Sequence, residues 1–187
     1  MDLNKYQEEQ VPSKSVVLLN LMTTSDIKDI VVCVTGIFDS EKDVFQQGCA
    51  VVIEMMSGLS VGFSCRDDIN AVTLWLERDG HRWCNEDYFE NDSEITSVRV
   101  SDSTDLKWQS ILKEKIDSFY VVKKHRFRNS KYESLSNEVG LILKINSEKY
   151  LYMNNDIGDS HNFTINLFDI MPLIDKDFYT MLELTVH

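Results

Sequence analysis

Short apolar runs rich in β-branched residues recur along this chain of 187 residues and are separated by turn signals. Between Leu59 and Cys65, large side chains alternate with Ser60, Gly62 and Ser64, which is the period of a half-buried strand. Most of these runs are too short for a buried helix of ordinary length. The pattern therefore favours a strand-rich fold, in which the small face of residues 59–65 meets water, a tight neighbour or a ligand.

Three pairs of expected strands are joined by short turns, which is typical of β-hairpins. The turns are Ser57-Gly58, Asp79-Gly80 and Asn146-Ser147-Glu148. The expected strands cover residues 16–22, 27–38, 49–56, 59–65, 71–77, 81–84, 95–100, 139–145, 149–153, 163–167 and 178–186. For the last of them, a helix opened by Asp175 is the alternative.

One amphipathic helix is expected over residues 104–118, with Ser103 or Thr104 as its N-cap. Its apolar stripe is formed by Trp108, Ile111, Leu112, Ile116 and Phe119. We therefore expect an α+β fold: a mainly antiparallel, meander-type sheet of about eight to ten strands, curved or partly closed, with this helix packed on one face. A β-sandwich is the alternative.

The length of the chain fits one domain that buries a core without disulfides or a structural metal. Residues 1–15 are polar, and we expect a flexible N-terminal segment there. Residues 16–187 then form a single globular domain, because no repeat or convincing linker interrupts them.

Acidic residues outnumber basic ones by 31 to 19, which gives a formal net charge of −12. This charge repels nucleic acids and anionic membranes and favours a basic protein partner, although it also simply keeps a protein soluble. The chain shows no signal peptide in its first 15 residues and no apolar run of about 18 residues, so we expect a cytoplasmic protein. In that compartment its four cysteines stay reduced.

The chain lacks the glycine patterns of phosphate-binding loops. His81 and Cys84 have no second pair at metal-ligand spacing, so no metal or other cofactor is expected. The cluster of Glu77, Asp79 and His81 carries the groups of an acid-base or hydrolytic site, and it leaves a hydrolase open as an alternative. No catalytic residue is otherwise predicted.

An acidic loop with aromatic side chains follows the second expected hairpin. It contains no Lys or Arg. Carboxylates steer a cationic partner, and aromatic rings supply contact area at little cost in entropy. The predicted partner-binding residues are Trp83, Glu86, Asp87, Tyr88, Phe89, Glu90, Asp92 and Glu94.

A basic segment with interleaved aromatic residues spans residues 123–131. In an extended conformation, Lys124, Arg126 and Arg128 share one face and leave His125 and Phe127 on the other. Such segments grip single-stranded nucleic acid in other proteins, but in this acidic chain we favour a contact with acidic groups of the fold or of a partner. The stripe is the secondary candidate surface.

These features favour a small, non-catalytic inhibitor of the kind that bacteria use as immunity proteins against toxic nucleases. It would act by occluding the basic substrate-binding surface of the toxin. The alternatives are a ligand-binding, β-barrel-like protein with a cavity over the small face of residues 59–65, and the hydrolase. The sequence does not determine the partner, the organism or the oligomeric state.

The acidic loop is predicted to contribute little to folding, because adjacent carboxylates without a basic neighbour repel one another and are not buried cheaply. Changing Glu86, Asp87, Glu90 and Asp92 together to Ser should alter the free energy of unfolding by less than about 0.5 kcal/mol. Thermal denaturation measures this change. A large loss of stability would show that the loop is structural and would remove the main argument for a binding role.

Overall fold

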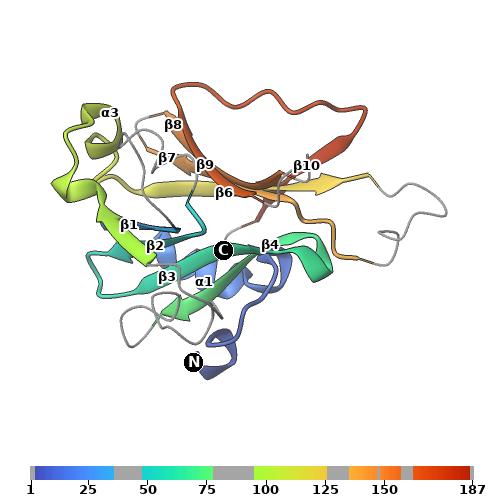
Figure 1. Ribbon diagram of the computed structural model, residues 1–187, viewed down its shortest axis with the longest axis horizontal. Helices are drawn as coiled ribbons and strands as arrows, with labels where there is room; N and C mark the ends of the chain where they lie inside the picture. Colours follow the sequence, from blue (N-terminus) through green and yellow to red (C-terminus); the bar gives the residue numbers. More distant parts are fainter. Residues whose placement is uncertain are drawn as a thin grey trace.

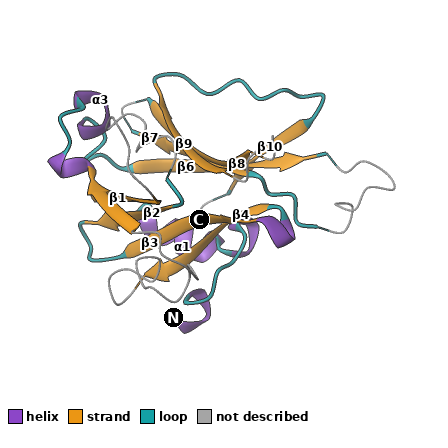
Figure 2. Ribbon diagram, in the orientation of Figure 1, coloured by secondary structure: helices purple, strands orange, loops and turns teal. Residues whose placement is uncertain are grey.

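The computed structural model describes residues 3–35, 48–77, 95–125, 135–146, 148–156 and 162–185. Strands dominate, and helices are short (Figure 2). The helices are α1 (Val16–Met22) and α3 (Leu106–Gln109), with single 3₁₀ turns at Asn4–Tyr6, Pro12–Lys14, Asp67–Ile69 and Val100–Asp102. The strands are β1 (Ile27–Thr35), β2 (Ala50–Met55), β3 (Ser60–Arg66), β4 (Ala71–Glu77), β5 (Ile95–Arg99), β6 (Ile116–Lys124), β7 (Gly140–Ile145), β8 (Lys149–Asp156), β9 (Asn162–Phe168) and β10 (Tyr179–Leu184).

The strands form two antiparallel sheets, which lie as two layers (Figure 1). The first sheet has the order β4-β3-β2-β1-β5, and the second has the order β10-β6-β7-β8-β9. Their inner faces share one apolar core, to which the first sheet contributes Ile30 and Phe63 and the second contributes Phe119, Leu143 and Ile165. The expected α+β class with antiparallel, meander-like strands is confirmed, while the strands divide between two layers as in the sandwich alternative.

The first predicted hairpin is confirmed. Strands β2 and β3 pair antiparallel from Ala50 opposite Ser64 to Glu54 opposite Ser60. Between them Gly58 has a φ of 84°, a left-handed conformation that glycine adopts without steric cost. The chain therefore needs its glycine at this turn.

The small face of β3 meets a tight neighbour. Gly62 lies opposite Trp75 of β4, and a Cβ atom built on Gly62 would lie only 2.1 Å from the Trp75 ring. Trp75 is completely buried, and its ring nitrogen donates to Glu77 Oε2 at 2.9 Å. The tryptophan thus occupies the space that a ligand would need above Gly62.

The predicted strand at residues 16–22 is wrong, because these residues form α1. Its run of apolar residues has no period of two, and Leu18, Leu19 and Met22 fall on one buried helical face. Leucine and methionine also favour helix over strand. In the sequence alone, the β-branched Val16 and Val17 and the short length of the run favour a strand.

The predicted helix at residues 104–118 is also wrong. Only α3 is helical there, and its N-cap is Asp105, which accepts hydrogen bonds from the backbone N–H groups of Lys107 and Trp108. Lys113 has a φ of 67°, and its N–H donates to Ile27 O at 2.7 Å. Ile27 N–H in turn donates to Glu114 O at 2.8 Å. These backbone hydrogen bonds with the start of β1 prevent the helix from continuing. The chain then enters β6.

Strand β6 has no counterpart among the predicted strands, whereas the other described strands agree with the predictions. Strands β7 and β8 form a hairpin from Gly140 opposite Asn154 to Ile145 opposite Lys149. Strand β9 alternates as expected, and the stretch at residues 178–186 contains β10 rather than a helix. The predicted strand at residues 81–84 lies outside the described residues, as does its Asp79-Gly80 turn.

Residues 3–15 pack against the domain. Tyr6 and Val11 are buried, and Gln10 exchanges two backbone hydrogen bonds with Leu74 of β4. Ser13 donates its N–H to the carboxylate of Glu138 at 2.9 Å. The flexibility expected for residues 1–15 concerns motion and stays a prediction, but these contacts give the segment a defined position.

Replacing Gly62 with Ala is predicted to destabilise the fold by about 1–3 kcal/mol, because the new methyl group overlaps the buried Trp75 ring. Chemical denaturation measures the loss. Ser60→Ala on the same face of β3 is the control and should change stability by less than about 0.5 kcal/mol. Equal stability of the two variants would show that the ring yields to the methyl group.

Candidate functional site

The predicted acidic loop, with Trp83, Glu86, Asp87, Tyr88, Phe89, Glu90, Asp92 and Glu94, lies outside the described residues. The same holds for Asp79 and His81 of the hydrolase cluster and for Arg126 and Arg128 of the basic stripe. Two of the predicted candidates, Glu77 and Lys124, are described at the ends of β4 and β6. Glu77 accepts the hydrogen bond from Trp75 and so helps to fix that ring.

The described start of the basic segment faces acidic groups and polar backbone of the fold. Lys123 Nζ lies 3.3 Å from Oε1 of the buried Glu138. His125 places Nδ1 3.1 Å from Asp177 O and Nε2 2.9 Å from Thr180 Oγ1, which ties the end of β6 to β10 and the residues before it. These contacts favour a role within the fold for Lys123 and His125.

An exposed apolar band follows the connection from β9 to β10 and then β10 itself. Five of the seven large apolar side chains that the described residues expose belong to it. The band consists of Ile170, Leu173, Phe178, Met181 and Leu182. Leu173 is 98% exposed, so its side chain makes no contribution to the core. This concentration of exposed apolar groups is the clearest candidate interaction surface of the described structure.

The connection between β9 and β10 is anchored where it crosses the outer face of the second sheet (Figure 1). Met171 and Ile174 pack against a cluster that includes Val122 and Ile142, with Tyr120, Tyr150, Tyr152 and Tyr179 around it. Met171 and Ile174 of the connection therefore point inward, while Leu173 points to solvent. The band is held in place and is not a loose tail.

Strand β10 lies outside the part of the second sheet that the first sheet covers, whereas its neighbour β6 lies inside it. Leu182 and Leu184 lie directly opposite Val121 and Phe119 of β6, so all four share the inner face of the sheet. Val121 and Phe119 are completely buried, but Leu182 remains 45% exposed. Both faces of β10 are thus accessible, because Met181 on the outer face is also exposed.

Among the described residues around β10, the charges are mainly negative. The exposed acids are Asp117, Asp175, Asp177 and Glu183, against the bases Lys124 and Lys176. Lys123 is neutralised by Glu138 at 3.3 Å. At the other end of the band Asp169 pairs with Lys107 at 3.5 Å. The surroundings of β10 therefore match a cationic partner better than an anionic one.

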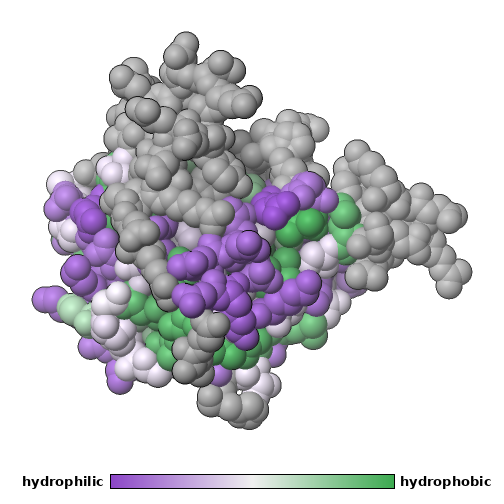
Figure 3. Space-filling model, turned by 90° about the horizontal axis from the view of Figure 1, so that it is seen from below, coloured by the Kyte–Doolittle hydropathy of each residue, from purple (hydrophilic) through white to green (hydrophobic). Residues whose placement is uncertain are grey.

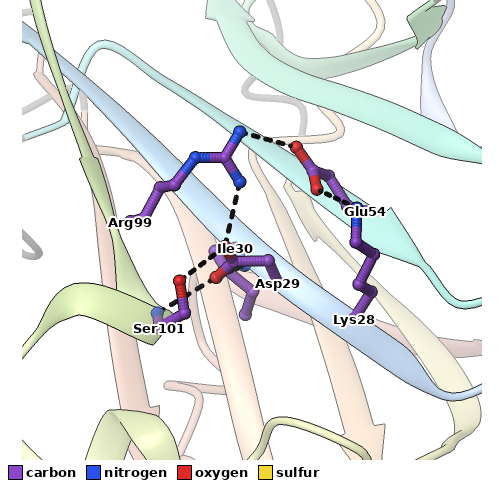
Figure 4. Close-up of polar contacts among 6 residues, drawn as sticks. All are labelled: Lys28, Asp29, Ile30, Glu54, Arg99 and Ser101. Carbon is purple, nitrogen blue, oxygen red and sulfur yellow. Dashed lines mark hydrogen bonds and ion pairs between the residues drawn. The ribbon is translucent and has the colours of Figure 1, made fainter.

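A network of charged groups on the first sheet was missed by the sequence analysis (Figure 4). Arg99 of β5 donates to Asp29 Oδ2 at 2.9 Å and to Glu54 Oε1 at 3.0 Å. Asp29 also accepts from the N–H and hydroxyl groups of Ser101 and from the N–H of Ile30. Residues from three adjacent strands thus meet at one point, and the network fastens β5 to β1.

Hydrogen bonding decides the ionisation of this network. Burial tends to raise the pKa of Asp29, but the hydrogen bonds from Ser101 and Arg99 outweigh it and leave the pKa below its ordinary value. In Glu54 burial is likewise outweighed, here by Arg99 and Lys28, so its pKa is lowered too. These carboxylates are fully used by partners within the fold, which favours a structural role.

Other surfaces and clusters of the described chain are less distinctive. Seen from below, hydrophilic side chains gather near the middle of the described surface and apolar ones lie beside them (Figure 3). Among the described residues, no three His, Cys, Asp or Glu side chains are grouped to hold a metal. Of the described cysteines, Cys33 is buried, and Cys49 and Cys65 are partly buried.

Replacing Arg99 with Met is predicted to destabilise the fold by about 1–3 kcal/mol at neutral pH, because Asp29 is left buried without its charged partner. Arg99 is itself 39% exposed, which keeps the loss below that of a fully buried pair. Arg66→Met, which removes an exposed pair with Asp68, is the control and should cost less than about 0.5 kcal/mol.

The same variant tests the pH dependence. A carboxyl with a lowered pKa in the folded chain stabilises the fold above its unfolded pKa, about 4, and this contribution is lost as the pH falls through the folded value. The wild type should therefore lose stability more steeply below about pH 4 than Arg99→Met does. Parallel curves would show that Arg99 does not set these pKa values.

No family model, curated protein or solved structure matches the chain in the comparisons with known proteins. Within the described residues, no helix is long and apolar enough to cross a membrane. The functional assignment therefore depends on the described surface and on the sequence.

Proposed function

We propose that the protein is a non-catalytic, acidic protein-binding inhibitor, most simply a bacterial immunity protein that neutralises a nuclease-like toxin in the cytoplasm. This proposal rests on the exposed apolar band that ends at β10. Around β10, the described acids outnumber the described bases. Exposure of apolar side chains that make no contribution to the core is unfavourable in water unless another molecule covers them. A partner protein with a basic surface is the occupant that both properties favour.

The proposed mechanism is occlusion of the partner's basic surface. The chain carries a net charge of −12, which accelerates encounters with a cationic protein at low ionic strength. Apolar groups such as Leu173 and Phe178 would then be desolvated against the partner and slow its release. The acidic loop remains a proposed second contact, with Trp83, Tyr88 and Phe89 as its anchors.

Neither alternative function gains support from the described contacts. A ligand cavity over β3 would need the space that Trp75 fills above Gly62. The hydrolase depends on Asp79 and His81, which lie outside the described residues, and Glu77 is engaged with Trp75. We therefore propose a binding function alone.

The protein encoded beside this chain is the natural partner to test, because an immunity protein is usually encoded next to its toxin. Leu173→Ser with Phe178→Ser is predicted to accelerate dissociation at least about tenfold, since both groups are exposed and available to a partner. Association should slow as salt rises. Surface plasmon resonance separates the two rates.

Met56→Ser with Leu106→Ser is the matched control, because both residues are exposed apolar groups outside the band. This control should bind like the wild type. Unchanged dissociation in the Leu173/Phe178 variant would exclude the band as the contact. A salt-insensitive association rate would contradict a basic partner.

A further inference from the structure

We propose that β10 accepts an extended strand of the basic partner along the edge that no described strand pairs with, so that the partner adds a sixth strand to the second sheet. The inference rests on the proposed function for the charge of the partner, and on the geometry of β10 for the mode of binding. β10 is the end strand of its sheet, and its four central residues, 180–183, are exposed. An exposed end strand is a template for strand addition.

The pairing of β10 with β6 shows which backbone groups face the free edge. His125 N–H donates to Phe178 O at 2.8 Å, so the pair 125 and 178 is a hydrogen-bonded pair. Because such pairs alternate along an antiparallel ladder, Thr180 and Leu182 direct their backbone groups to β6. Residues 179, 181 and 183 direct theirs outward.

One of these outward residues is already engaged within the chain. Tyr179 donates its N–H to Asp175 O at 2.9 Å, which agrees with its orientation away from β6. Met181 and Glu183 are the two remaining positions, and their N–H and C=O groups are the ones that an added strand would bond. A strand that docks here gains up to four backbone hydrogen bonds without breaking one between described residues.

The side chains of β10 define the sequence pattern of the added strand. On the inner face, Leu182 and Leu184 favour apolar residues at the opposite positions of the added strand. On the outer face Glu183 is the only charged side chain of β10, and it calls for a base. Apolar and basic residues should therefore alternate along the partner strand, because successive side chains point to opposite faces.

The edge lacks the usual protection against strand pairing. Its six residues include no Lys and no Pro, and a single charge, Glu183, stands among them. A second copy of this chain is the less favourable occupant, because each copy carries a charge of −12 and its described residues bring four acids against two bases around β10. A basic strand relieves that repulsion.

The proposal is tested with two synthetic ten-residue peptides, one alternating Lys and Val and one alternating Glu and Val. Amide hydrogen exchange is followed by NMR in the full-length protein at millimolar peptide. The Lys-Val peptide should slow exchange at Met181 and Glu183 at least about fivefold and leave Thr180 and Leu182, which already bond β6, nearly unchanged. The Glu-Val peptide, and a Lys-Val peptide with N-methylated backbone, should protect neither residue.

Protein variants separate the backbone from the side chain at the same position. Met181→Pro removes an outward N–H that bonds no described residue and should abolish protection of Glu183, while Met181→Ala should retain it. If Met181→Pro does not fold, the N-methylated peptide still tests the backbone contact. Equal protection by the Lys-Val and Glu-Val peptides would overturn the basic partner strand. No protection by either peptide would overturn strand addition.

Protection without any peptide would overturn the proposal as well. If it rises with protein concentration, a second copy occupies the edge, and if it does not, the edge is already paired within the chain. The outcomes also separate this inference from the proposed function. Salt-sensitive binding of the neighbouring protein with no effect of Met181→Pro would exclude strand addition alone, whereas protection by the Lys-Val peptide without any such binding would exclude the inhibitor alone.

Discussion

Burial of two opposed sheet faces in one core is the constraint on which the rest of the structure depends. Each large side chain that enters this core contributes about 1.5–3 kcal/mol, and α1 adds Leu18, Leu19 and Met22 to the same core. The two layers do not overlap completely. Val121 of β6 is completely buried while Leu182 beside it on β10 is 45% exposed, so the covered area ends between these neighbouring strands. The accessible surface at β10 is therefore a consequence of how the layers overlap.

Buried carboxylates hold the elements that the core alone secures weakly. Glu138 joins Ser13 of the N-terminal segment to Lys123 of β6, and Asp29 joins β1 to Arg99 and Ser101. A buried carboxylate is stable only with such partners, so each contact also specifies where the connected segment must lie. The internal acids and the exposed acids thus have different roles in one chain. The former fix positions within the fold, and the latter set the charge that a partner meets.

The sequence predicts the fold well where a side-chain period is expressed over a whole strand. Phe163, Ile165 and Leu167 alternate, and all three are buried in β9. It fails at residues 104–118, where the right apolar residues are buried but the left-handed backbone at Lys113 and the pairing with Ile27 replace the helix by a turn and a strand. The candidate site could not be predicted for a related reason. The alternation of side chains shows which residues share a face of a strand. Only the packing of the two sheets shows that the inner face of β10, which carries Leu182, is not covered by the first sheet.

The groups that β10 offers to a partner take no part in the interactions between described residues. Met181 and Glu183 direct backbone groups away from β6, and the side chains of Leu173 and Phe178 are exposed. A partner that used them would gain apolar contact and backbone hydrogen bonds without competing with interactions that stabilise the monomer. Their substitution should accordingly separate binding from stability, which is rarely possible at an interface built from core residues. The acids near β10 add long-range attraction to this short-range contact, so that charge governs the approach of the partner and the strand edge governs how long it stays.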